Sequence, residues 1–295
     1  MNHKQDPNWL SSYSEGSAAI HGETAIIKKI LEIIGTGDFK WCVDFGAGNG
    51  ISASNTNFFI NEEGFSAVLI EPMKSRYESL KNYYKNNKNV ITLNSFVGFS
   101  GNNTLDILLK DTGITKNFDF LSVDIDGNDY HVWKAIKNYF PKVVCIEFNQ
   151  TVPPNIEFIQ NADPNVNQGT GILSFYKLAK EKGYELVCVS EYNAFFVLKE
   201  YFHLFHIDDN SPHLMCSDEE ITYLFTGYDG KIFLEGSKKI RWHSMEINER
   251  KIQQIPKLIQ KFPPNYNFLE RFFFRLWRFK SSPKKFLESI MKKNR

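Results

Sequence analysis

Three aspartates, Asp124, Asp126 and Asp129, lie within six residues of one another in this 295-residue sequence. Asp124 ends an apolar run at 119–124, whose composition predicts a buried strand, and the other two aspartates follow that run. Neighbouring carboxylates repel one another and are costly to bury unless a cation, hydrogen-bond donors or a helix N-terminus relieves them. The spacing therefore predicts that a positively charged group binds at this acidic turn.

Two kinds of positive group fit the acidic turn. One is the sulfonium of S-adenosylmethionine, together with its ammonium group. The other is a divalent metal ion, because hard oxygen ligands favour Mg²⁺ or a similar ion. The ligands of that ion would be Asp124, Asp126, Glu147 and Asn149. The turn resembles a calcium-binding EF-hand loop, but Ala135 stands at the twelfth position, where that loop requires Glu, and we exclude calcium signalling.

His131 comes directly after the acidic turn. A neutral imidazole there could act as the general base for an acceptor hydroxyl. Alternatively, an aspartate of the turn could deprotonate that hydroxyl, or a bound metal could promote its deprotonation. As an early residue of a helix-compatible segment, His131 fits a surface or capping role equally well.

A second motif, Asp44-Phe-Gly46-Ala-Gly48-Asn-Gly50, follows the first predicted strand. Three glycines at alternate positions allow a sharp turn and let a ligand lie against bare main chain. The spacing differs from the GxGxxG motif of dinucleotide-binding folds because Ile51 stands at the third glycine position, and the Lys-Ser/Thr of a phosphate loop is absent. A pyrophosphate ligand is therefore disfavoured.

Polar residues also end the next two predicted strands. Glu71 ends the second strand, where a carboxylate can accept hydrogen bonds from both hydroxyls of a ribose. A helix-capping role for Glu71 is the alternative. Asn94, Ser95 and Phe96 end the third strand and offer an amide, a hydroxyl and an aromatic face that suit adenine, although Phe96 could equally pack in the core.

The elements that position these motifs alternate between short apolar runs and longer helix-compatible segments, which is typical of βαβ units. Strands are predicted near 41–45, 67–71, 90–94, 119–124 and 142–148, and helices near 18–34, 53–63, 74–87, 103–110 and 129–139. A turn-rich segment, 150–171, is predicted to form a loop over a site. It precedes a helix at 172–182 that ends at Gly183.

Two further strands, 185–189 and 194–198, are separated by about four residues, too few for a parallel crossover. They must therefore pair antiparallel. The sequence thus predicts an α/β fold with a Rossmann-like, doubly wound, mostly parallel seven-stranded sheet. The sheet ends in an antiparallel hairpin, and a small C-terminal extension follows.

The overall composition is that of a folded protein, with 42% hydrophobic residues, 15% aromatic residues and 35 Lys+Arg against 34 Asp+Glu. The polar start lacks the apolar run of a signal peptide, and no stretch approaches the roughly 20 apolar residues that span a bilayer. We therefore expect a cytoplasmic location. There the four cysteines, which form no CxxC pair, would stay reduced: Cys42, Cys145, Cys188 and Cys216.

The charge is unevenly distributed along the chain. Residues 268–295 carry nine Lys/Arg against two Glu, a charge of +7, which leaves −6 on the rest. Arginines interleaved with bulky apolar groups over Phe268–Lys280 are typical of a helix at a membrane surface, or of a terminal helix packed on its own domain. We expect peripheral contact with an anionic membrane at its inner face, and no nucleic-acid partner because the acidic body would repel phosphates.

Taken in order, the motifs at 44–50, 69–72, 120–130 and 144–149 resemble those of class I S-adenosylmethionine-dependent methyltransferases. Within that class the chain is similar to the FkbM-like branch found in surface-glycan gene clusters. The resemblance covers roughly residues 12–200. It implies cofactor contacts at Asp44, Gly46, Gly48, Gly50, Glu71, Asn94, Ser95 and Phe96. It further implies that Asp124 faces the methyl group and that Glu23 belongs to a stretch folded over the cofactor.

The resemblance implies O-methylation of a sugar or glycan-precursor hydroxyl, in some relatives with Mg²⁺ held by acidic residues after the fourth and fifth strands. The expected organisation is a methyltransferase domain over 1–200, an appended α/β element over 201–267 and a basic aromatic helix over 268–295. A membrane-docked adaptor that keeps the fold without catalysis is one alternative. A nucleotide-dependent oxidoreductase is another, opposed by the missing GxGxxG motif and by the terminal hairpin.

Overall fold

The computed structural model describes residues 6–14, 22–52 and 54–284. The chain divides into two compact units, Met1–Ser217 and Asp218–Arg295. The first unit continues past residue 200 because Phe205, in the 3₁₀ helix η3 (Lys199–Phe205), and Met215, in α7 (Pro212–Met215), are buried in it.

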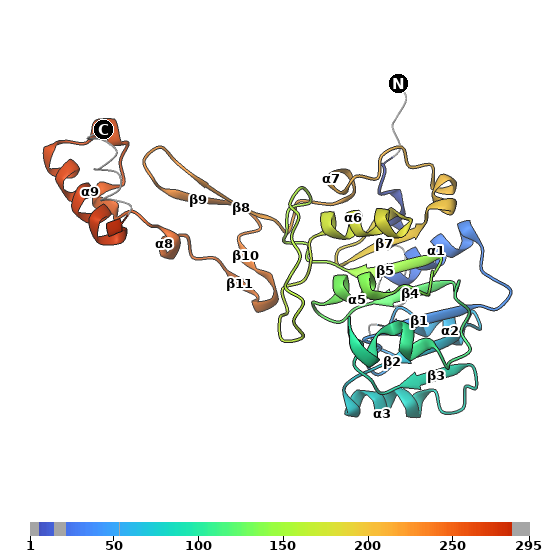
Figure 1. The fold of residues 1–295 in the computed structure, drawn as a ribbon. Helices are drawn as coiled ribbons and strands as arrows, with labels where there is room; N and C mark the ends of the chain where they lie inside the picture. Colours follow the sequence, from blue (N-terminus) through green and yellow to red (C-terminus); the bar gives the residue numbers. More distant parts are fainter. Residues whose placement is uncertain (1–5, 15–21, 53, 285–295) are drawn as a thin grey trace, which may run out of the picture. The chain divides into compact units, whose positions relative to one another are not determined.

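The first unit is built on one seven-stranded sheet (Figure 1). Its strands are β1 (Trp41–Phe45), β2 (Ser66–Ile70), β3 (Val90–Leu93), β4 (Phe120–Val123), β5 (Val143–Glu147), β6 (Tyr184–Val189) and β7 (Asn193–Leu198). Their spatial order is β3-β2-β1-β4-β5-β7-β6. The pairings from β3 across to β5 are parallel, whereas β7 is antiparallel to both β5 and β6. The predicted fold class, a mostly parallel sheet with a terminal antiparallel hairpin, is confirmed.

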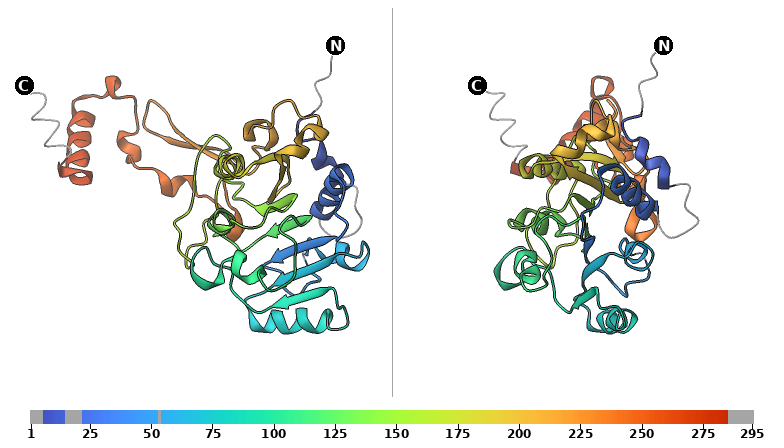
Figure 2. Two further views of the ribbon diagram at one scale, coloured as in Figure 1. Left: turned by 45° about the vertical axis from the view of Figure 1, so that its right-hand side comes forward. Right: turned by 90° about the vertical axis from the view of Figure 1, so that its right-hand side faces the viewer.

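Helices cover both faces of the sheet (Figure 2). They are α1 (Gly22–Ile34), α2 (Asn57–Asn61), α3 (Lys74–Tyr83), α4 (Leu105–Leu109), α5 (Asp129–Ala135) and α6 (Ile172–Lys182). Side chains of α1, α2 and α3 pack into one core, and those of α4, α5 and α6 pack into the other. Strands between two helical layers are buried on both faces, which explains their nearly continuous apolar runs.

Several helices are shorter than their apolar patterns predict. The segment predicted at 53–63 is helical only over α2, because the Ser54 hydroxyl accepts hydrogen bonds from Thr56 N (3.3 Å) and Asn57 N (3.1 Å) before the helix begins. The predicted α6 ends as expected, with Gly183 in the left-handed conformation at φ +82°. Residues 18–21 of the first predicted helix lie outside the described residues.

The cysteines are all free, and Cys42, Cys145 and Cys188 are buried in the first unit. Cys216 is partly buried. Within the described ranges, no helix is long and apolar enough to cross a membrane.

Four apolar residues are buried in the second unit: Ile221, Leu234, Ile259 and Tyr266. Its elements are a hairpin of β8 (Thr222–Thr226) and β9 (Ile232–Gly236), a short pair of β10 (Lys239–Ile240) and β11 (Met245–Glu246), α8 (Glu249–Ile252), the 3₁₀ helix η5 (Lys257–Ile259) and α9 (Phe268–Ser281). Helix α9 begins with a capping box, in which Asn267 Oδ1 accepts from Glu270 N and Asn267 N donates to Glu270 Oε2, both at 2.8 Å.

Candidate active site

The glycine turn after β1 passes directly against the end of β4. Gly46 has φ +88°, and a Cβ atom there would lie 1.8 Å from the carbonyl oxygen of Asp124, so only glycine fits. Gly48 also has a positive φ, +57°, but no atom lies within 4 Å of its Cβ position. The first glycine therefore serves close packing, and the second leaves open space beside the main chain.

Two other residues of the same motif face inward. A Cβ on Gly50 would lie 2.5 Å from Leu80 Cδ1, so this glycine lets the turn pack on α3. Asp44 is 4% exposed and accepts a hydrogen bond from Thr56 Oγ1 at 2.9 Å. Burial raises the pKa of Asp44 to about 7. Neither Asp44 nor Gly50 lines the cavity described next.

A cavity of about 580 Å³ opens beside the carboxyl ends of β1, β2 and β4. Six residues singled out in the sequence line it: Gly46, Gly48, Glu71, Phe96, Asp124 and Asp126. In an open α/β sheet this edge, where the strand order reverses between β1 and β4, is the usual ligand site. Sequence reasoning missed other lining residues, among them Ser52, Met73, Arg76 and Ile125. Arg76 could have been found from its place as the third residue of α3, in the first turn of the helix.

Glu71 joins the glycine turn to α3. Its Oε2 accepts from Gly48 N at 2.9 Å, and its Oε1 accepts from Met73 N, the N-cap residue of α3, at 2.7 Å. The carboxylate thus holds the helix start and also lines the cavity. Each oxygen keeps a lone pair for a ligand.

The residues after β3 play different parts. Asn94 Nδ2 donates to the carbonyl oxygens of Glu71 (2.8 Å) and Pro72 (3.1 Å), so it braces the loop after β2. The Ser95 hydroxyl donates to Phe96 O at 3.1 Å. Of these residues only Phe96 lines the cavity, and this residue is 44% exposed.

The acidic turn is folded around Asp129. This side chain is 3% exposed and accepts hydrogen bonds from Ile125 N and Gly127 N, both at 2.9 Å. Burial raises the pKa of Asp129 to about 7. The turn also holds Asp126 at φ +57°, a strained conformation for a residue other than glycine. The turn's own backbone donors therefore relieve one of its three carboxylates.

The other two carboxylates of the turn meet Glu147 from the end of β5. Asp124, Asp126 and Glu147 each place a carboxylate oxygen within 4.8 Å of the others. Asp124 is exposed to the cavity and Glu147 is half-buried. Partial loss of hydration and the repulsion of neighbouring carboxylates raise the pKa of both groups. Glu23, on α1, adds a further negative charge that raises the pKa of Asp124, while its Oε1 accepts from Asn193 Nδ2 at 3.2 Å.

Two other residues proposed from the sequence form hydrogen bonds with the 150–171 segment. Asn149 Oδ1 accepts from the backbone N and the hydroxyl of Thr151, and its Nδ2 donates to Gln168 O at 2.7 Å. The His131 ring Nε2 lies 2.8 Å from Gln160 O, and His131 does not line the cavity. Both side chains hold the 150–171 segment in place.

The 150–171 segment packs against the acidic turn, and none of its residues lines the cavity. Asn167 Nδ2 donates to Asp126 O at 2.6 Å, and Asn128 Nδ2 donates to Asp163 O at 3.1 Å. Gln160 ties the segment to itself, since its Oε1 accepts from the backbone N of residues 168 and 169 at 2.8 and 2.9 Å.

No family model matches the sequence, and no curated protein matches it. Among solved structures, the fold is similar to that of the N-terminal domain of EvdMO1 crystallised with SAH bound (12% identity, 61% of this chain, 80% of that chain, TM-score 0.39). It is also similar to a S-adenosylmethionine-dependent methyltransferase from Clostridium acetobutylicum ATCC 824 (10% identity, 59% of this chain, 89% of that chain, TM-score 0.38). A third similar structure is the CMeT domain of the citrinin polyketide synthase (10% identity, 60% of this chain, 51% of that chain, TM-score 0.42). At these values the likeness concerns the fold and says nothing about activity.

Proposed function

We propose that the chain is a methyltransferase that uses S-adenosylmethionine. The observation that carries this proposal is the convergence of Gly48, Glu71 and Asp124 on one cavity at the switch point of the sheet. These residues come from three different strand ends, and a packed core alone gives no reason for all three to line one cavity.

The residues present fit that cofactor. Open space beside Gly48 admits a ligand against the main chain. Glu71 would accept the ribose hydroxyls, and the exposed face of Phe96 would stack on the adenine ring. Asp124 would lie near the ammonium and sulfonium charges, which relieve its crowding with Asp126 and Glu147. When bound, the cofactor supplies an electrophilic methyl group.

The acceptor that we propose is a hydroxyl of a sugar or glycan precursor. The 150–171 segment, rich in Asn and Gln, reaches the acidic turn through Asn167, and its amides suit a hydroxyl-rich acceptor. Asp124 would take the proton of that hydroxyl, because a carboxylate with a raised pKa is a stronger base, whereas Glu147, whose pKa is raised to about 9, already holds its own proton near neutral pH. Since His131 Nε2 is already occupied by Gln160 O, we assign His131 to positioning this segment.

A magnesium ion is part of the proposal. Asp124, Asp126 and Glu147 form a set of three carboxylates close enough to bind one ion, and hard oxygen ligands suit Mg²⁺. The fourth ligand expected from the sequence, Asn149, has its amide oxygen occupied by Thr151. Such an ion would lower the pKa of an acceptor hydroxyl bound to it and would orient that hydroxyl.

We also propose that α9 contacts an anionic membrane surface. Six apolar side chains of this helix are each between 46% and 84% exposed: Phe268, Leu269, Phe272, Phe273, Leu276 and Phe279. The opposite side of the helix is held within its own unit, where Arg271 Nε donates to Tyr266 O at 3.1 Å and the Phe274 and Tyr266 rings lie 5.5 Å apart. An apolar face flanked by arginines favours the headgroup region of a bilayer.

Calorimetric titration of the full chain with S-adenosylhomocysteine, beside NAD, tests the enzyme proposal. We expect binding of S-adenosylhomocysteine alone, because the turn lacks the third glycine of dinucleotide-binding folds. Binding of NAD alone would favour an oxidoreductase. Binding of neither would favour an adaptor that keeps the fold without catalysis.

A further inference from the structure

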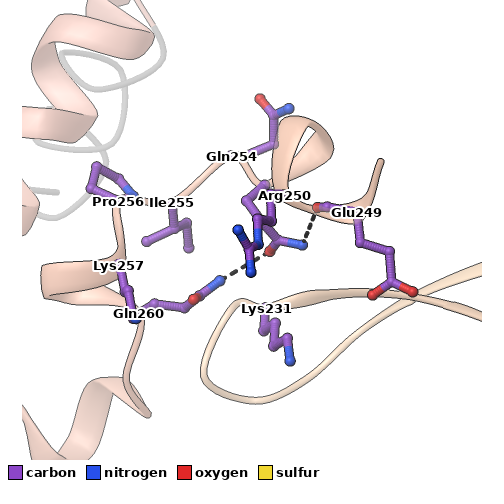
Figure 3. Close-up of a pocket in the computed structure, with 9 residues that line it drawn as sticks. Lys231, Glu249, Arg250, Gln254, Ile255, Pro256, Lys257 and Gln260 are labelled. Carbon is purple, nitrogen blue, oxygen red and sulfur yellow. Dashed lines mark hydrogen bonds between the residues drawn. The ribbon is translucent and has the colours of Figure 1, made fainter. Parts of the chain in front are cut away.

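A second cavity, of about 990 Å³, lies entirely within the second unit (Figure 3). It is open to solvent and is lined by Lys231, which precedes β9, by Arg250 of α8 and by the segment that leads into η5. Its size is at the upper end of the range for small-molecule sites. None of its lining residues belongs to the cavity of the candidate active site.

The wall of this cavity is formed without a ligand. Gln253 Nε2 donates to the carbonyl oxygens of Ile232 (2.8 Å) and Glu249 (2.9 Å), and Gln253 Oε1 accepts from Ile232 N at 2.9 Å. Gln260 Nε2 donates to the same Oε1 at 3.0 Å (Figure 3). One side chain thus fixes the hairpin, α8 and η5 to one another, so the groups around the cavity are positioned in advance.

The charge around the cavity is positive. Lys231, Arg250 and Lys257 contribute three cations, and Glu249 is the one acidic lining residue. Glu249 Oε1 lies 3.4 Å from Lys238 Nζ, so its charge is already compensated outside the cavity lining. Within the described part of the chain, none of the three lining cations forms an ion pair, and Lys231 Nζ lies over the Phe233 ring, 4.8 Å from its centroid. An anion bound among them would offset their mutual repulsion.

The kinds of side chain indicate which anion fits. A guanidinium and ammonium groups are the groups that proteins use to bind phosphate, and Arg250 lies in the middle of the lining residues (Figure 3). Glutamine amides and the apolar surface of Ile255 and Pro256 complete the lining and suit the polar and apolar parts of an organic molecule. We propose that this cavity binds a small phosphate-bearing molecule, with Arg250 and Lys231 as its phosphate ligands.

The test compares paired variants of the full-length chain. Lys231→Gln/Arg250→Gln removes two cavity cations, whereas Lys239→Gln/Lys251→Gln removes two exposed cations of the same unit that do not line the cavity. Calorimetric titration uses sodium pyrophosphate and glucose 1-phosphate, with glucose as the uncharged control. We expect both phosphates to bind, at least about tenfold more weakly in the cavity variant and less than about twofold more weakly in the control variant.

A second experiment distinguishes a lipid headgroup from a soluble phosphate-bearing molecule. Vesicles of phosphatidylcholine, with or without phosphatidylglycerol, replace the soluble probes. Binding to the phosphatidylglycerol vesicles alone, weakened in the cavity variant and kept in the control variant, would support the site and assign its phosphate to a lipid headgroup.

The proposal is overturned if no probe binds the unaltered chain, or if the cavity variant binds the probes as well as the control variant does, since the attraction would then come from diffuse surface charge or from α9. Melting temperatures of both variants verify that they fold, which exposed Lys→Gln and Arg→Gln changes permit. The titration with S-adenosylhomocysteine should be the same for both variants. A failure there concerns the methyltransferase proposal and not this site.

Discussion

Glu71 is the residue on which the candidate site most depends. Its carboxylate holds Gly48 N and Met73 N, so the shape of the glycine turn and the start of α3 are both fixed by one side chain. The two readings drawn from the sequence, ribose ligand and helix cap, are therefore compatible. A carboxylate already oriented by backbone donors loses little freedom when a ligand binds.

Replacement of this carboxylate by an amide tests that role. Glu71→Gln should weaken binding of S-adenosylhomocysteine at least about tenfold, because an amide loses acceptor capacity and a charge-assisted hydrogen bond is worth about 1.5–3 kcal/mol. Calorimetric titration measures the effect. Glu78→Gln, an exposed position on the same helix, should bind as the unaltered chain does. Equal affinities for the two variants would show that Glu71 does not touch the ligand.

Asp44 makes stability depend on pH. Burial raises the pKa of this carboxyl to about 7 from an ordinary value of 3.8. Between these values the unfolded chain has released a proton that the folded chain keeps, so the free energy of unfolding falls as pH rises from about 4 to about 7. Asn at position 44 cannot ionise. Between pH 5 and pH 8, the free energy of unfolding should therefore fall in Asp44→Asn by at least about 1.4 kcal/mol less than it falls in the unaltered chain.

Urea unfolding at several pH values measures this difference. Thr56→Ser, which keeps the hydroxyl that donates to Asp44, serves as the control and should follow the unaltered chain. Parallel pH profiles for Asp44→Asn and the unaltered chain would contradict the assignment, because the titrating group would then lie elsewhere.

The three-carboxylate cluster should respond to Mg²⁺ without any substrate. At ten times its dissociation constant the ion should stabilise the full chain by about 1.4 kcal/mol, since it binds the folded cluster. The melting temperature reports this gain. It should disappear in Glu147→Gln and persist in Glu62→Gln, an exposed position away from the cluster. Full stabilisation in Glu147→Gln would exclude the cluster as the binding site.

At the scale of elements, the site is made by loops that rigid strands hold against each other. The glycine turn after β1 packs on the end of β4, the loop after β2 is braced by Asn94, and the 150–171 segment is tied to the acidic turn by Asn167. The contact between the glycine turn after β1 and the end of β4 leaves no room for a side chain at Gly46.

Gly46→Ala should therefore destabilise the first unit by about 3 kcal/mol. An L-residue at positive φ costs about 1–2 kcal/mol, and overpacking against Asp124 O adds about 1–3 kcal/mol. Gly64→Ala has a similar φ, +72°, with nothing within 4 Å of the new Cβ, so it should cost only the backbone strain. Urea denaturation compares the two variants. If both lose the same stability, the close approach to β4 is relieved by movement of the turn.

At the scale of the whole molecule, the two compact units carry different surfaces. The first contains the candidate active site, and the second contains α9 and the cationic cavity. The separation of charge seen in the sequence, with +7 on residues 268–295 and −6 on the rest, supports a surface-binding role for the second unit.

Flotation with vesicles tests the proposed membrane contact. The full chain should float with vesicles that contain phosphatidylglycerol, and a chain that ends at Asn267 should not. Phe272→Ser/Leu276→Ser should reduce the partition coefficient at least about tenfold, because both exposed apolar groups would enter the headgroup region. Ser281→Ala, at the end of α9, is the matched control. Equal flotation of the full and shortened chains would discard the proposal.

Local features of the sequence were enough to predict the sheet, because strand burial follows from apolar runs and the antiparallel pairing of β6 and β7 follows from their short connection. The predicted ends of the strands also placed Glu71 and the acidic turn at one edge of the sheet. The direction of each side chain depended on partners far along the chain. Asp44 turns to Thr56, Gly50 packs on α3, and His131 and Asn149 turn to the 150–171 segment. Spacing along the chain specifies which residues reach one edge of the sheet, whereas packing between distant segments selects those that face the cavity.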